Sequence, residues 1–138
     1  MFQNLVTMLN TQQTGLFIIR FGIGLIFIKH GFDKLIGGPP TWIWLGSQMR
    51  LLGITFAPLM WGIAQLLTEL LGGMCLIIGF QTRIAAGFLC FGMLVATIYH
   101  VSRGDEWKIY SYPLSLLVVS LGLVFTGSGL FSLDGCLR

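Results

Sequence analysis

The sequence predicts an all-α integral membrane protein, an antiparallel four-helix bundle that forms a single transmembrane domain over residues 1–138. Three observations predict this class: 55% of the residues are hydrophobic, only 9% are charged, and the mean hydropathy is +0.86. A soluble domain carries roughly a quarter charged residues. Because each membrane crossing needs about 20 apolar residues, four crossings and their loops occupy the chain. This leaves no room for a soluble catalytic domain.

The first span is expected at residues 13–35. Its apolar run is interrupted by Arg20 and ends in a polar cluster at residues 29–34. Glycines and prolines at residues 37–40 favour a helix end there. Residues 41–55 contain two tryptophans and are too short and too polar to span. Because amphipathic rings are stable at the water interface, we expect an interfacial or re-entrant segment at this place.

The second, third and fourth spans are expected at residues 58–80, 84–101 and 114–131. The second span carries one acidic residue, Glu69, in its interior. Only residues 81–83 connect the second span to the third. The short connection makes these two helices antiparallel neighbours.

Arg20 and Glu69 are charged positions inside predicted spans. A charge at the centre of an inserted helix costs about 2.5–3.5 kcal/mol, so each of them needs a partner. At about 1.5 Å per residue, their predicted depths differ by less than the reach of an arginine side chain, which predicts an Arg20–Glu69 ion pair. Two interpretations stay open: a buried bridge that fixes the register of two helices, or the polar floor of a ligand pocket or proton relay.

His30 and Lys34 are four residues apart and share one face of the first helix. A histidine that titrates near neutrality beside an ammonium group can hydrogen-bond a quinone-like carbonyl and pass it a proton. The alternative is a helix C-terminus that collects cations for its dipole and for lipid phosphates. His100 ends the third span, which runs parallel to the first, so we expect it near the same membrane surface. The candidate ligand-binding residues are therefore Arg20, His30, Lys34, Glu69 and His100.

Other kinds of chemistry have no support in the sequence. Two histidines without HxxxH spacing or clustered acids make a poor metal site, so we expect no metal. The three cysteines have no CxxC spacing and are interpreted as structural thiols. No serine or cysteine has a base at plausible spacing, so we assign no catalytic residue. The net charge of +3 is dispersed along the chain, which predicts no binding of nucleic acid.

Four short motifs, taken in order along the chain, resemble those of the DoxX family: Arg20 in the first span, His30-Gly31-x-x-Lys34 at its end, Glu69-x-x-Gly72-Gly73 in the second span, and Gly79-x-x-Thr82-Arg83 before the third. The resemblance covers nearly the whole chain. It implies a four-helix bundle in a bacterial or archaeal membrane. It also implies a link to redox systems, because the family is named after a subunit of thiosulfate:quinone oxidoreductase and related members have been linked to redox-stress complexes.

We therefore expect a multi-pass inner-membrane protein that binds a quinone or a similar amphipathic small molecule in a pocket lined by Arg20, His30, Lys34 and Glu69. It would be an accessory or quinone-facing subunit of an oxidoreductase system. Membrane lipid, a soluble or membrane redox protein and a second copy of the chain are the candidate partners. The alternative class is non-enzymatic: a scaffold or assembly factor, or a small transporter that needs oligomers because four helices leave little room for alternating access.

Overall fold

The computed structural model describes residues 1–137, except for the side chain of Leu9. The described chain is helical and contains no strand; its helices are α1 (Phe2–Ser47), the 3-10 helix η1 (Gln48–Leu52), α2 (Pro58–Ile78), α3 (Thr82–Ser102), α4 (Trp107–Thr126) and α5 (Leu133–Cys136). Four of these helices are long and apolar enough to cross a membrane. The predicted fold class, an all-α membrane protein with four spans, is confirmed.

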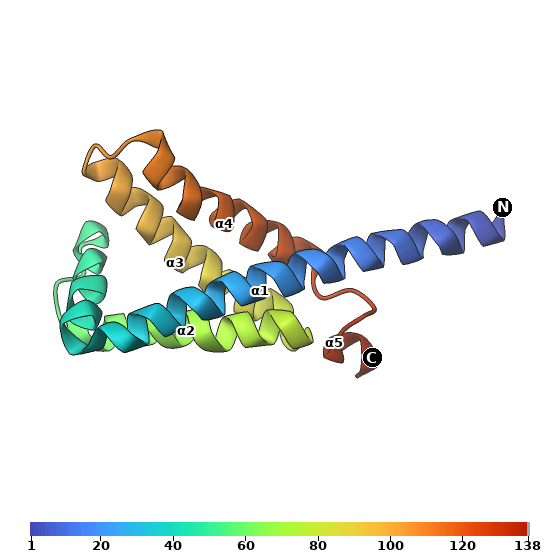
Figure 1. Cartoon of the computed structure of the whole chain (residues 1–138), viewed down its shortest axis with the longest axis horizontal. Coiled ribbons are helices and arrows are strands. Elements are labelled where there is room, and N and C mark those ends of the chain that lie inside the picture. Colours follow the sequence, from blue (N-terminus) through green and yellow to red (C-terminus); the bar gives the residue numbers. More distant parts are fainter. Residues whose placement is uncertain (138) are drawn as a thin grey trace.

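The helices form two hairpins, α1 with α2 and α3 with α4 (Figure 1). The first hairpin is packed closely because two glycines face each other across it. A Cβ atom added at Gly24 would lie 2.7 Å from the Gly73 carbonyl oxygen, and one added at Gly73 would lie 2.7 Å from the Gly24 carbonyl oxygen. Small residues at such positions let membrane helices approach backbone to backbone. This contact fixes the register of α1 against α2.

The two hairpins share one apolar core. Phe27 of α1, Leu76 of α2 and Leu89 of α3 are fully buried, and Leu116 and Leu123 of α4 pack with them. Figure 1 shows that α2 and α3 lie closest at the turn that joins them and diverge toward the opposite end of the bundle. A cavity lies between them on the side of η1.

A sharp kink at Gly38 divides α1. This glycine has φ 75° and ψ −174°, a conformation that is strained for residues with a side chain, and two prolines follow it. Beyond the kink the chain packs back on the start of α2: a Cβ atom at Gly46 would overlap the Pro58 carbonyl, and one at Gly62 would overlap the Trp42 carbonyl. Residues 41–55, for which we expected an interfacial or re-entrant segment, thus form the last helical turns of α1, then η1 and the loop to α2.

The helix bounds differ from the expected spans at both ends of the chain. Helix α1 begins at Phe2 and projects well beyond the other helices (Figure 1). Helix α4 begins at Trp107 rather than at 114, because Pro113 is accommodated inside it. It ends at Thr126, where Gly127 adopts φ 71°. The expected fourth span therefore extended too far at its C-terminal end.

Candidate functional site

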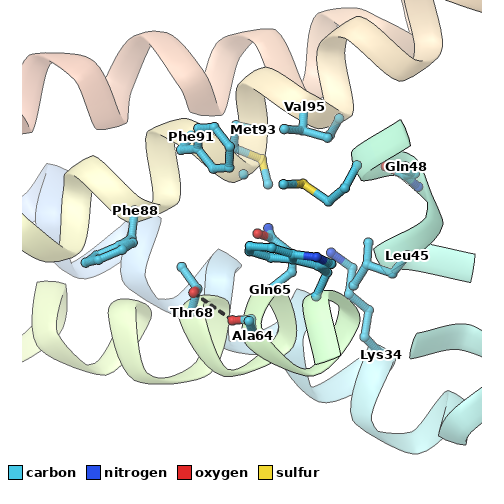
Figure 2. Close-up of a pocket in the computed structure, with 14 residues that line it drawn as sticks. Lys34, Leu45, Gln48, Ala64, Gln65, Thr68, Phe88, Phe91, Met93 and Val95 are labelled. Atoms are coloured by element: carbon cyan, nitrogen blue, oxygen red, sulfur yellow. Dashed lines mark hydrogen bonds between the residues drawn. The ribbon is translucent and has the colours of Figure 1, made fainter. Parts of the chain in front are cut away.

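A cavity of about 210 Å³ lies at the wide end of the space between α2 and α3, closed by η1 and the end of α1 (Figure 2). Its walls are mainly apolar and aromatic, with Phe88, Phe91 and Met93 on α3 and Met49 on η1. Figure 2 shows Lys34 reaching it from α1, opposite the α3 side chains. An apolar cavity with polar groups at one end is the usual form of a small-molecule site.

The polar end of the cavity is built around a buried carboxylate. Glu69 is 0% exposed, and its Oε1 atom accepts hydrogen bonds from Lys34 Nζ at 2.5 Å and from Gln65 Nε2 at 3.1 Å. Lys34 and Gln65 both line the cavity. The ion pair therefore holds an ammonium group at the cavity wall and offsets the cost of burying its charge.

One hydrogen-bond donor in the cavity wall is unused. The indole Nε1 atom of Trp61 is buried and has no hydrogen-bond partner among the described residues, and the same is true of Glu69 Oε2. An unsatisfied buried polar group costs about 1–3 kcal/mol. Trp61 lines the cavity, so a residue of the cavity wall carries a buried donor without a partner among the described residues.

Arg20 lies elsewhere in the bundle. It is 0% exposed and donates hydrogen bonds to the Leu76 carbonyl oxygen at 3.1 Å and to the Phe131 carbonyl oxygen at 2.5 Å. Among residues 1–137, the expected Arg20–Glu69 ion pair does not form, because Glu69 binds Lys34 instead. The Gly24–Gly73 contact explains why the two residues do not meet. It places Arg20 beside the C-terminal turns of α2, about 10 Å along that helix from Glu69.

The two histidines also lie outside the cavity wall. His30 Nε2 is 2.5 Å from the Tyr112 hydroxyl of α4, and the two ring centroids are 5.3 Å apart. His100 Nδ1 is 2.8 Å from Asp105 Oδ2 in the loop between α3 and α4. Of the five candidate ligand-binding residues, only Lys34 lines the cavity, and Glu69 holds it in place.

The sequence analysis missed Trp61 and Gln65. With Glu69 they recur every four residues on α2 and therefore share one face of that helix. The available signal was a stripe of an indole and an amide that leads to a buried acid. The α3 side chains opposite them gave no such signal, because apolar residues are expected on every face of a membrane helix.

The thiols and the acids of the chain do not gather at this cavity. Cys75, Cys90 and Cys136 are free in the structure. In the part of the chain that the structure describes, no three side chains of His, Cys, Asp or Glu are grouped so as to hold a metal ion. The cavity wall itself presents an ammonium group, amide groups, and aromatic and thioether surfaces.

Fold and site together define a multi-pass helical membrane protein with a mainly apolar cavity between its hairpins. The DoxX family model matches residues 15–102, more than half of the chain. The chain therefore belongs to the DoxX family, which confirms the resemblance of the four sequence motifs.

Two curated relatives are similar over most of their lengths. The inner membrane protein YqjF of Escherichia coli (strain K12) is 28% identical over 134 residues, which cover 92% of this chain and 95% of YqjF. The putative oxidoreductase CatD of Bacillus subtilis (strain 168) is 27% identical over 122 residues, which cover 88% of this chain and 86% of CatD. No solved structure matches the chain significantly.

Proposed function

We propose that this inner-membrane protein binds a quinone, or an amphipathic molecule of similar chemistry, in the cavity between α2 and α3. It would act as the quinone-facing accessory subunit of a membrane oxidoreductase system. The observation that carries the proposal is the buried indole N–H of Trp61, which has no acceptor among the described residues and lines a cavity with aromatic walls. A quinone carbonyl is an acceptor of suitable size on a flat apolar ring.

The polar end of the cavity suits a carbonyl that becomes anionic on reduction. Trp61 Nε1 would donate to the oxygen, and the Lys34 ammonium group would stabilise negative charge on it. Glu69 holds Lys34 in position through a bond of 2.5 Å. Since His30 does not line the cavity, the proposal assigns it no contact with the ligand, in contrast to the pocket expected from the sequence.

The walls of the cavity suit the flat ring of a quinone. Phe88 and Phe91 offer aromatic faces and edges that favour offset or perpendicular ring packing. Met49 and Met93 offer thioethers that make favourable contacts with aromatic rings and adapt to irregular shapes. The printed name of the Bacillus subtilis relative, a putative oxidoreductase, supports the redox setting.

Mass spectrometry of organic extracts from protein purified in mild detergent tests the proposal. We expect stoichiometric quinone from the wild type and about tenfold less from Trp61→Phe, because one lost hydrogen bond of about 1.4 kcal/mol corresponds to a factor of ten. Trp107→Phe is the matched control, since Trp107 is 62% exposed at the start of α4. If all three samples yield only bulk phospholipid, quinone binding is wrong and the scaffold or transporter alternative takes its place.

A further inference from the structure

A second hollow adjoins the cavity along the seam between α2 and α3. It has a volume of about 310 Å³ and shares Ala64, Thr68 and Phe88 with the first. It continues past Gly72 and Cys75 of α2 toward the turn between the helices. The two hollows share part of their walls and follow each other along the seam as one path. We call the second hollow, which lies beyond Phe88, the seam groove.

The seam groove offers almost no polar group to a ligand. The Thr68 hydroxyl, which is part of its wall, already donates to the Ala64 carbonyl oxygen at 2.7 Å, as the dashed line in Figure 2 shows. Gln81 lies at its far end, and the remaining wall is formed by small and aliphatic residues with one thiol and one phenyl ring. The unused donor of the path is thus at the cavity end, where Trp61 lies.

Small residues form the floor of the seam groove. At Gly72 the two helices pack closely, because a Cβ atom added there would lie 3.1 Å from Leu89 Cγ of α3. From Trp61 to Cys75 the path follows α2 for about 21 Å, at 1.5 Å per residue. A path of this length exceeds the size of a single ring and suits an extended chain.

Resting on the proposed function, we infer that the ligand of the cavity carries a long apolar tail, and that this tail lies in the seam groove. The polarity of the path matches such a molecule, with hydrogen-bond donors at the cavity end and an apolar wall beyond. Lipid chains are as apolar as the groove wall, so the tail gains little transfer free energy there. The groove therefore determines where the apolar tail lies, and it orients the polar head of the ligand toward Trp61 from the bilayer side.

A photoaffinity probe tests where the tail lies. The probe is a benzoquinone with a decyl chain that ends in a diazirine, added to the purified full-length protein in mild detergent. After irradiation, we expect mass spectrometry to find the label on residues 67–85, and Trp61→Phe to reduce that labelling about tenfold together with quinone binding. Label on other helices, with Trp61-dependent quinone binding intact, would overturn the tail position and leave the cavity assignment standing.

A groove-filling variant makes the test independent of the head site. Leu67→Trp places a large ring in the seam groove, and Leu121→Trp is its matched control on α4; the two leucines are 46% and 47% exposed. We expect about tenfold less labelling of residues 67–85 for Leu67→Trp and none of this loss for Leu121→Trp.

A phospholipid that carries a diazirine on its acyl chain tests whether membrane lipid, and not the quinone tail, occupies the seam groove. If it labels residues 67–85 as strongly as the quinone probe does, and excess unlabelled decyl benzoquinone does not compete, the seam groove is an ordinary lipid contact and the inference is wrong. If quinone binding itself does not depend on Trp61, the failure lies in the proposed function rather than in the tail position.

Discussion

The Arg20 end and the Lys34 end of the bundle each hold a cation among the helices, but the two cations differ in their partners and in their burial. Arg20 is 0% exposed and donates to two backbone carbonyl oxygens, one at the C-terminal turns of α2 and one in the segment after α4. Lys34 instead pairs with the carboxylate of Glu69 at the wall of a cavity. The first cation connects chain segments, and the second lies at the wall of the cavity in which we propose that a ligand binds.

The surroundings of the two cations explain the difference. Near Arg20 the C-terminal segment folds back on the bundle: Asp134 accepts hydrogen bonds from the amides of Gln81 and Thr82, at 2.9 and 3.2 Å, and the Gln13 side chain accepts one from the Leu130 amide at 2.8 Å. At the Lys34 end the helices diverge and leave a hollow. What surrounds each intramembrane charge therefore distinguishes the two: packed chain segments lie around Arg20, and a cavity lies beside Lys34.

The largest effect is expected at the Lys34 end. Lys34→Met leaves the fully buried Glu69 carboxylate without its cation, and breaking such a pair costs about 3–5 kcal/mol. Unfolding of the purified protein by titration with SDS would measure the loss. The double variant Lys34→Met with Glu69→Gln is expected to recover most of the stability, and a double variant as unstable as the single one would contradict the ion-pair account.

Arg20 is expected to have the next largest effect on stability but none on the ligand. Arg20→Met removes donors from the Leu76 and Phe131 carbonyl oxygens, at a cost of about 3 kcal/mol. Limited proteolysis is expected to cut residues 127–137 sooner. Arg20→Lys, which keeps the charge, serves as the milder control. If Arg20→Lys folds normally but loses bound quinone, the Arg20 end also contributes to ligand binding and the contrast between the two ends is wrong.

A smaller effect is expected for the hydrogen bond between α1 and α4. Tyr112→Phe removes the hydroxyl that lies 2.5 Å from His30 Nε2, which costs about 1 kcal/mol. Because neither residue lines the cavity, the quinone content of the purified protein should not change. A Tyr112→Phe variant that folds normally but loses its quinone would extend the site to His30.

The smallest effect is expected at the surface. Lys29 forms an ion pair with Asp33, and their side chains are 71% and 53% exposed. Lys29→Ala should therefore change the free energy of unfolding by less than about 0.5 kcal/mol, as is usual for exposed pairs. A loss comparable to that of Lys34→Met, measured in the same SDS titration, would mean that removal of a lysine charge costs stability whether or not its partner is buried.

Much of the fold could be predicted because hydropathy is a local property. The apolar runs predicted four spans, and the three residues between the second and third predicted a tight hairpin, which the α2–α3 turn realises. The fourth span was expected to begin at residue 114, directly after Pro113, although α4 begins at Trp107 and contains this proline. The α5 segment was missed because its order depends on contacts such as those of Asp134 with distant amides.

The sequence by itself determined the class of the protein, its four spans and the identity of its buried charges, because composition and periodicity are carried by neighbouring residues. Only the tertiary structure decided which groups the charges meet. The Gly24–Gly73 contact sets the register that separates Arg20 from Glu69, and the kink at Gly38 brings η1 over the space between α2 and α3. Since hydrogen bonds and ion pairs act over a few ångströms, a shift of two helical turns is enough to exchange one partner for another.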